Sequence, residues 1–338
     1  MKFLIFSVFI TLFIPLKSNA VEKFSNYIPM TESGFPVNAH GGQIFNYQGY
    51  YYWVGENEGK GADDRHGFNI YRSTDFKYWS LCGNVLNVYS ENNLYPDVTK
   101  GDIFERPRII YNKKTKKFNL WFHYEKKNSS YTTAKVAVAT SGEICKNYQI
   151  VRMMRLNPRV FPLGEGKGTL AFNKYFLRDF NKGQMSRDLT VFDDGSKSYL
   201  ISSSENNATL IVTELNDKFD NITERFVRVN PGTWSEAPIV MKANGYFYII
   251  ASGTTGWKPN KAQLYRSNKM LGKWHSLGNP VVGIRDRNNT FYSQGTSIFK
   301  VEDNYIFLGD RWNESDLSKS EYVWKRIRIS KNTIEIGG

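Results

Sequence analysis

The sequence predicts an all-β fold, a single-domain five-bladed β-propeller, and three observations carry this prediction. Phe, Tyr and Trp make up 15% of the 338 residues. Strand-like alternation and aromatic-rich runs dominate over helical periodicity. A short apolar run, a polar turn and a longer aromatic-rich run recur five times, at intervals of about 50 to 80 residues, which is typical of propeller blades.

Each repeat is a predicted β-hairpin, and the five hairpins cover residues 44–54, 109–122, 189–201, 239–250 and 297–308. Asn-Gly and Asp-Gly turns such as Asn244-Gly245 suit tight hairpins because their backbones accept positive φ. Further strands are predicted at residues 68–75, 136–141 and 262–268. The tripeptide Tyr-Arg-Ser recurs in the first and the last of these strands. The main alternative fold, a β-sandwich, does not explain this recurrence. No Pro- or Ser-rich linker divides the chain, so we expect one domain over residues 21–338 and no appended carbohydrate-binding module.

The first twenty residues are predicted to be a secretory signal peptide. Lys2 precedes an apolar run from Phe3 to Leu16, and the small residue Ala20 marks the cleavage site. The run is too short for a membrane span, which needs about 20 residues. We therefore expect a secreted or periplasmic protein without a membrane anchor.

The net charge of +13 is the most conspicuous feature of the composition, and loss of Lys2 and Lys17 with the signal leaves 13 − 2 = +11. Export and the lack of a basic domain motif argue against a nucleic-acid partner. Cys82 and Cys145 either pair or remain buried thiols. Two cysteines and four scattered histidines do not suggest a metal site, and we expect no cofactor.

Polar residues stand at the start of the innermost strand of every predicted blade. They are His40, Glu105, Asp188, Glu236 and Gln294. Because innermost strands line the central channel, these side chains are expected to meet at one mouth of it. Crowded carboxylates shift one another's pKa, so that one stays protonated while another stays ionised. A glycosidase needs such a pair, with a proton donor for the leaving oxygen and a group that handles water.

The same segments resemble glycoside hydrolase family 43, and more specifically its exo-β-1,3-galactanase branch. The resemblance is carried, in order along nearly the whole mature chain, by residues 39–42, 51–56, 105–107, 186–190, 202–207, 235–238, 252–257, 293–294 and 309–312. It implies a secreted five-bladed propeller that cleaves glycosidic bonds with inversion.

The resemblance also implies roles for the converging residues. Glu236 would be the general acid, and Asp188 would hold it and tune its pKa. The family's general-base aspartate is missing, because residues 39–42 read Ala-His-Gly-Gly. The branch places a glutamine, Gln294, across from the acid, where it would act through its imidic tautomer or by orienting water. Glu105 is the conventional base candidate, although the resemblance gives it a substrate-holding role, so the base stays open. An inverting site predicts about 6.5–9.5 Å between the acid and the water-handling group.

Substrate contacts follow from the resemblance as well. The residues are Glu56, Arg106, Tyr131, Asn207, Thr254 and Trp257. Trp257 lies in a segment whose composition is typical of a loop, where its ring is available to stack on the apolar face of galactose. Tyr131 also fits an ordinary strand position. Trp53, Trp79, Trp121 and Trp274 are predicted to be core residues, and His40 to be a structural hydrogen-bonding residue.

The expected function is exo-acting release of galactose from β-1,3-galactan, such as the backbone of arabinogalactan, by a monomer. A basic surface would suit uronic acids on such a polysaccharide. Two alternatives stay open: a family 43 α-L-arabinofuranosidase or β-xylosidase, and a non-catalytic sugar-binding propeller. The missing aspartate at the entry to the first blade argues against the arabinofuranosidase or xylosidase. The presence of Glu105, Asp188 and Glu236 together argues against the sugar-binding propeller, which does not require them.

Overall fold

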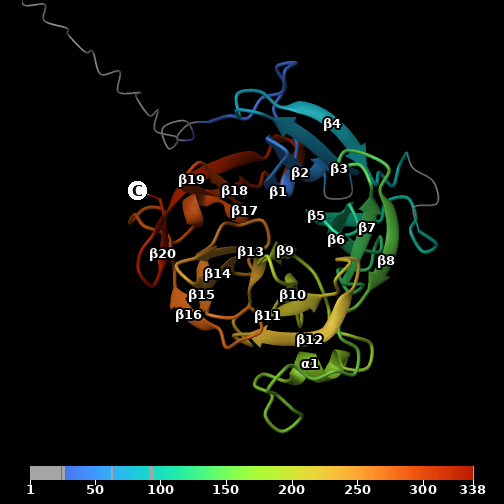
Figure 1. Ribbon diagram of the computed structural model, residues 1–338, viewed down its shortest axis with the longest axis vertical. Coiled ribbons are helices and arrows are strands. Elements are labelled where there is room, and N and C mark those ends of the chain that lie inside the picture. Colours follow the sequence, from blue (N-terminus) through green and yellow to red (C-terminus); the bar gives the residue numbers. More distant parts are fainter. Residues whose placement is uncertain (1–23, 25–26, 62–63, 91–94, 338) are drawn as a thin grey trace, which may run out of the picture.

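The computed structural model describes residues 24, 27–61, 64–90 and 95–337, and the predicted signal peptide lies outside them. Five four-stranded antiparallel sheets surround a central axis (Figure 1). Over the described residues, the only α-helix is the six-residue α1 (Lys174–Asp179), and no helix is long and apolar enough to span a membrane. The prediction of an all-β, five-bladed propeller is confirmed.

Each blade consists of four strands that are consecutive in the chain, numbered from the axis outward. Blade 1 contains β1 (His40–Tyr47), β2 (Tyr50–Glu58), β3 (Arg65–Ser73) and β4 (Ser80–Val85). Blade 2 contains β5 (Ile103–Asn112), β6 (Lys117–Glu125), β7 (Lys135–Ser141) and β8 (Gln149–Met154). Blade 3 contains β9 (Leu189–Asp193), β10 (Ser198–Ser204), β11 (Thr209–Leu215) and β12 (Ile222–Val229). Blade 4 contains β13 (Glu236–Ala243), β14 (Tyr246–Ser252), β15 (Gln263–Ser267) and β16 (His275–Gly278). Blade 5 contains β17 (Gln294–Val301), β18 (Asn304–Arg311), β19 (Glu321–Ile329) and β20 (Ile334–Ile336).

The five predicted hairpins form the two inner strands of the five blades. In blade 4, Ala243 pairs with Tyr246 across a two-residue turn. Asn244 and Gly245 in that turn have φ of 48° and 78°, which is the left-handed backbone that a tight hairpin needs. The strands predicted at residues 68–75, 136–141 and 262–268 are found as β3, β7 and β15.

Side-chain packing, rather than a shared strand, closes the ring between blade 5 and blade 1. Phe24 stacks on Trp324 with a ring-centre distance of 5.5 Å, and Trp53 meets the same ring edge-on at 5.4 Å. The Tyr322 hydroxyl accepts a hydrogen bond from the Ala39 amide at 2.9 Å. All four tryptophans predicted for the core are buried, namely Trp53, Trp79, Trp121 and Trp274.

A disulfide joins blades 1 and 2. Cys82 in β4 pairs with Cys145 in the turn between β7 and β8, with the two Cα atoms 5.6 Å apart. The neighbouring Gly83 has no room for a side chain, since a Cβ there would lie 1.9 Å from the Cys145 carbonyl oxygen. The structure thus decides between pairing and free thiols in favour of pairing.

Arg108 in β5 divides the central channel. Its guanidinium donates to the Gly41 carbonyl at 2.7 Å, the Thr190 hydroxyl at 3.2 Å and the Thr296 carbonyl at 3.0 Å, which come from three other innermost strands. Burial, followed by the charge of Arg106, lowers the pKa of Arg108 to about 9. On one side lies the mouth where the innermost strands begin, called here the upper mouth.

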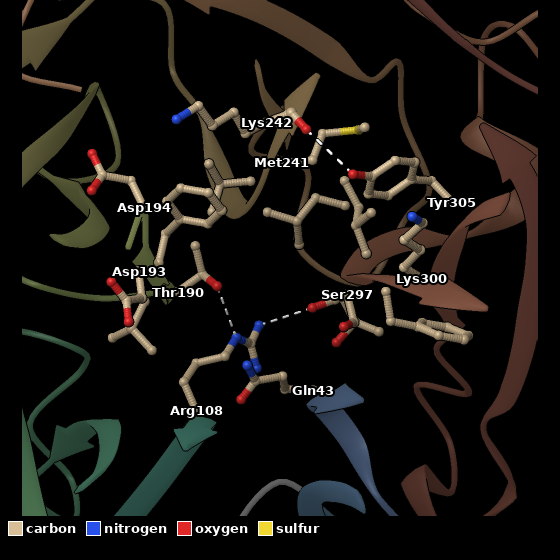
Figure 2. A pocket seen from close by; sticks show the side chains of 17 residues that line it. Gln43, Arg108, Thr190, Asp193, Asp194, Met241, Lys242, Ser297, Lys300 and Tyr305 are labelled. Carbon is tan, nitrogen blue, oxygen red and sulfur yellow. Dashed lines mark hydrogen bonds between the residues drawn. The ribbon is translucent and has the colours of Figure 1, made fainter. Parts of the chain in front are cut away.

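On the other side of Arg108 lies a second cavity of about 460 Å³, called here the lower cavity. Figure 2 shows Arg108 and Gln43 at one end of it, with Lys242, Lys300 and Tyr305 toward the opposite rim. None of Glu105, Asp188 and Glu236 lines this cavity. The channel therefore has two ends of different chemistry, and the candidate site belongs to the upper one.

Candidate active site

Local irregularities aim the polar residues at the upper mouth. Strand register shifts directly after the first residues of β1, β5, β13 and β17, and such bulges re-aim side chains next to functional sites. Gly41, Arg106 and Ala237 in these bulges have φ of 59°, 55° and 49°. Gly41 is required, because a Cβ there would lie 2.1 Å from the Glu56 Oε1 atom. Positive φ at Arg106 and Ala237 is a backbone strain of the kind stored at functional sites.

Glu236 at the start of β13 is a neutral acid at physiological pH. Its Oε2 accepts a hydrogen bond from Asn207 Nδ2 at 3.0 Å, and its Oε1 accepts one from Gln294 Nε2 at 3.3 Å. Burial and then the Asp188 charge raise the pKa of Glu236 to about 8, against the opposing effect of Arg106. This carboxyl therefore carries a proton that it can donate.

Asp188 is tied to the strand that carries Glu236. Its Oδ2 accepts a hydrogen bond from the Ala237 amide at 3.0 Å and lies 3.0 Å from Arg106 Nη2. The structure thus brings Asp188 and Glu236 together, and the Asp188 charge is one source of the raised pKa of Glu236.

Gln294 at the start of β17 is held by four hydrogen bonds. Its Oε1 accepts from Arg106 Nη2 at 2.6 Å and from Trp312 Nε1 at 3.0 Å. Its Nε2 donates to Glu236 and to the Ser252 hydroxyl, the latter at 3.0 Å. Since two donors point at Oε1, the ordinary amide form is favoured over an imidic tautomer in this arrangement.

The expected wide separation of Glu236 and Gln294 is wrong in this structure. A gap of about 6.5–9.5 Å is expected of an acid and a water-handling group, whereas Gln294 Nε2 lies 3.3 Å from Glu236 Oε1. The reason is geometric: the two side chains leave the starts of β13 and β17, which are neighbours around the axis, and turn toward each other.

Glu105 at the start of β5 has the opposite electrostatic environment. It forms an ion pair with Arg65, accepts a hydrogen bond from His123 Nδ1 at 2.9 Å and accepts another from the Tyr131 hydroxyl at 2.7 Å. Burial acts to raise the pKa of Glu105, but Arg65 and His123 outweigh it and hold this pKa well below its usual range. Glu105 is therefore ionised.

Glu105, His123 and Asp188 each offer one donor atom, and these atoms lie within 4.8 Å of one another. However, both His123 ring nitrogens already face carboxylates, Glu105 at 2.9 Å and Glu125 at 3.1 Å. Burial acts to lower the pKa of His123, but its hydrogen bonds to these carboxylates raise it to about 9. In this structure the cluster forms a hydrogen-bonded network, in which the His123 ring lies between the carboxylates of Glu105 and Glu125.

The residues predicted to contact substrate fall into two groups. Arg106, Tyr131 and Asn207 each hydrogen-bond a carboxylate or amide of the site, namely Gln294, Glu105 and Glu236. Glu56 lies behind them, only 2% exposed, and accepts a hydrogen bond from the Arg106 amide at 2.9 Å. Tyr131 lies in the loop between β6 and β7 rather than in a strand.

Thr254 and Trp257 lie in the loop after β14, and both are partly exposed. The Trp257 ring meets Trp312 edge-on with a ring-centre distance of 5.4 Å. A small pocket beside Gln294 is lined in part by these two tryptophans and Tyr292. The pocket, with a volume of about 30 Å³, is too small for a sugar ring, so only the exposed part of the Trp257 indole is available to one.

His40 is a buried structural residue, as the sequence suggested. Its Nδ1 lies 3.1 Å from Asp310 Oδ1, and its ring stacks on Tyr322 at 4.5 Å. Trp312 lies 5.7 Å from the imidazole and links it to Gln294. His40 therefore stands one layer behind the carboxylates.

Sequence reasoning missed several members of the site. Arg65, His123, Ser252, Asp310 and Trp312 were not assigned to it. Three of them lie opposite a predicted residue in the strand register: Glu105 pairs with His123, Glu236 with Ser252, and Gln294 with Asp310. Reading the residue opposite each strand start would have identified these three. Arg65 comes from β3 and has no such signal.

This geometry defines a class. A five-bladed propeller with a protonated carboxyl and an ionised carboxylate gathered at one mouth of its channel is the arrangement of a glycoside hydrolase. The comparisons agree. The profile of the glycosyl hydrolases family 43 matches residues 173–318, whereas no curated protein sequence gives a significant match.

Solved structures extend the match over nearly the whole chain. A family 43 β-1,3-galactosidase with galactodeoxynojirimycin is 37% identical with a TM-score of 0.86, and the match covers 93% of this chain and 98% of that one. An exo-β-1,3-galactanase from Clostridium thermocellum is 31% identical with a TM-score of 0.77, over 93% and 64% of the two chains. The exo-β-1,3-galactanase from Phanerochaete chrysosporium, with galactose, is 28% identical with a TM-score of 0.75, over 93% and 66%. This chain therefore spans slightly less than two thirds of the latter two. It belongs to glycoside hydrolase family 43.

Proposed function

We propose that this glycoside hydrolase is an exo-acting enzyme that releases galactose from β-1,3-galactan with inversion. The observation that carries the proposal is the neutral Glu236 carboxyl, held by Asn207 and Gln294 beside the Asp188 charge. A neutral acid with a pKa near the working pH is suited to protonate a leaving glycosidic oxygen. The substrate follows from the solved relatives named above, which are β-1,3-galactosidases and exo-β-1,3-galactanases.

Two buried polar atoms support a ligand at this mouth. Twelve buried side-chain polar atoms of the described residues have no hydrogen-bond partner, and Arg106 Nη1 and Asn207 Oδ1 are two of them. Buried polar atoms without partners are rare and need an explanation. Both belong to side chains proposed to contact substrate, where sugar hydroxyls offer the missing donor and acceptor. Tyr131, Thr254 and Trp257 complete the proposed binding set, and Glu56 supports it from behind through the Arg106 amide.

Two residues compete for the handling of the water. Glu105 is ionised, as a general base must be, but the depressed pKa of its carboxyl makes it a weak proton acceptor. Gln294 faces the acid directly, so it is suited to orient the Glu236 carboxyl, not to accept a proton. We propose Gln294 for this positioning role and Glu105 for holding substrate hydroxyls, and mutagenesis of both residues distinguishes the roles.

Export is part of the proposal. The predicted signal peptide supports a location outside the cytoplasm, and the Cys82–Cys145 disulfide suits an oxidising compartment.

The test is incubation of the purified protein with β-1,3-galactobiose and β-1,3-galactotriose. The expected result is release of galactose, which disappears in Glu236→Gln, with NMR showing the inverted anomer first. Activity confined to aryl xylosides or arabinosides would instead assign the second sugar class. Tight galactan binding without product would identify a sugar-binding propeller.

A further inference from the structure

Three partly exposed aromatic side chains cluster beside the site without a role in it. Phe172 and Trp234 are each 41% exposed, and Tyr175 is partly exposed. The three ring centres are 5.9, 6.4 and 6.2 Å apart in pairs. We call Phe172, Tyr175 and Trp234 the aromatic platform.

The topology places the platform on the face of the upper mouth. Innermost strands begin at this face, so the turns after second strands and the connections between blades return to it. Phe172 and Tyr175 lie in the connection between β8 and β9, where α1 lies beside β12 at the rim (Figure 1). Trp234 lies in the connection between β12 and β13, two residues before Glu236.

Backbone hydrogen bonds connect the segment that carries Trp234 to Asn207, which holds the acid. The Trp234 amide donates to the Ala208 carbonyl at 3.2 Å, and the Ser235 amide donates to the Asn207 carbonyl at 2.8 Å. Asn207 itself donates to Glu236. The platform and the proton donor therefore share one backbone support.

A buried arginine fixes the platform in place. Arg228 in β12 donates to the Phe172 carbonyl at 3.0 Å and forms an ion pair with Glu205 at 2.7 Å. Gly232 lets the Phe172 ring approach, since a Cβ there would lie 3.1 Å from that ring. Phe172 and Trp234 are held at φ of 47° and 54°. Positive φ at a bulky residue is unfavourable by itself, so the contacts of Arg228 and Gly232 help to hold this backbone.

We propose that the aromatic platform binds the departing part of the galactan chain, on the leaving-group side of the bond that is cleaved. This inference rests on the proposed function. The acid protonates the leaving oxygen, so the departing sugars lie on the side of Glu236, and the platform extends outward from its support. The apolar faces of β-linked galactose units pack on exposed aromatic rings. Trp257 and Trp312, beside Gln294, remain for the galactose that is released.

The experiment uses the full-length protein and β-1,3-galactooligosaccharides of two to six units. Trp234→Ala is expected to raise KM by about tenfold for the longest substrates, the size of one lost ring contact, and less for the disaccharide. Tyr175→Ala, a second variant, is expected to show the same length dependence. Tyr78→Ala is the matched control: this ring is 51% exposed but lies between β3 and β4, at the opposite face, and KM is expected to stay unchanged at every length.

Two outcomes would overturn the platform. One is a KM for hexasaccharide that is unchanged in both variants, and the other is an equal loss at every length, which would show an effect on the acid. Calorimetric binding of the same series to Glu236→Gln separates this inference from the proposed function. If wild-type protein releases no galactose, the proposed function fails. In that case, an affinity for the oligosaccharides that grows with chain length and falls in Trp234→Ala supports the platform. An affinity that is independent of chain length or of Trp234 overturns it.

Discussion

Glu105 and Glu236 occupy equivalent places in two blades and have opposite chemistry. Each lies at the start of an innermost strand, just before a bulge, and each is largely withdrawn from solvent. Glu105 meets Arg65 and His123, so the pKa of its carboxyl falls. At Glu236, burial and then the Asp188 charge raise the pKa of the carboxyl to about 8, although the hydrogen bond from Asn207 acts in the opposite direction. Strand register brings carboxylates together, but their neighbours decide which one holds a proton.

The neighbours come from different elements: Arg65 lies in β3 and His123 in β6, whereas Asp188 directly precedes β9. His123 in β6 lies opposite Glu105, whereas Ser252 in β14 lies opposite Glu236. Arg65 and His123 thus face the Glu105 carboxylate, whereas the Ser252 hydroxyl donates to the Glu236 backbone carbonyl at 3.3 Å and the Asp188 charge acts on the Glu236 carboxyl. Changes at these two clusters should therefore have different consequences.

Removing the proton of Glu236 is expected to have the largest effect. Glu236→Gln keeps the shape of the side chain but not the acid, so kcat on β-1,3-galactotriose should fall by about 10³-fold. The control is Glu224→Gln, an exposed glutamate in β12, which should keep wild-type turnover. Residual activity within tenfold of wild type would contradict the role of Glu236 as the acid.

The disulfide and the Arg65–Glu105 ion pair both join blade 1 to blade 2. Replacing Cys82 and Cys145 together by serine should lower the free energy of unfolding by about 4 kcal/mol, the chain-entropy value for this loop. Urea unfolding of oxidised wild type and the double variant measures this difference. An unchanged midpoint would show that the disulfide adds nothing to the blade 1–blade 2 contact.

The roles of Gln294 and Glu105 are separated by kinetics. Gln294→Ala should lower kcat by about 100-fold with little change in KM, because it removes the group that orients the acid. Glu105→Gln should raise KM more than it lowers kcat. The reverse pattern, with near-normal turnover in Gln294→Ala, would assign the water-handling role to Glu105.

The smallest expected effect is a shift in pH dependence. Glu236 must be protonated to act, so kcat/KM should be retained below pH about 8 and lost above it, in line with the pKa of this carboxyl. In Asp188→Asn the like charge is removed, which lowers the pKa of Glu236 and should move the basic limb to lower pH. A pH–rate profile of both proteins tests the sign, and a shift to higher pH would contradict it.

Much of the fold was predictable because its signals are local. Asn244-Gly245 and the aromatic runs after each turn specify hairpins within about ten residues of chain. The convergence of Glu105, Asp188, Glu236 and Gln294 was also predictable, since equivalent strand starts must meet at one end of a propeller. The distance between Glu236 and Gln294 was not, because it depends on side-chain conformations from two blades.

The sequence by itself determined the five blades, the residues at their inner starts and the family to which they point. Only the tertiary structure decided that Cys82 pairs with Cys145, that Arg65 and His123 keep Glu105 ionised, and that Gln294 lies against Glu236. The physical reason is the sequence distance over which each interaction acts. Turn formation and the alternation of polar and apolar residues depend on residues that are close together in the chain. Charge and burial act between any groups that the fold brings together, and they set the protonation of the site.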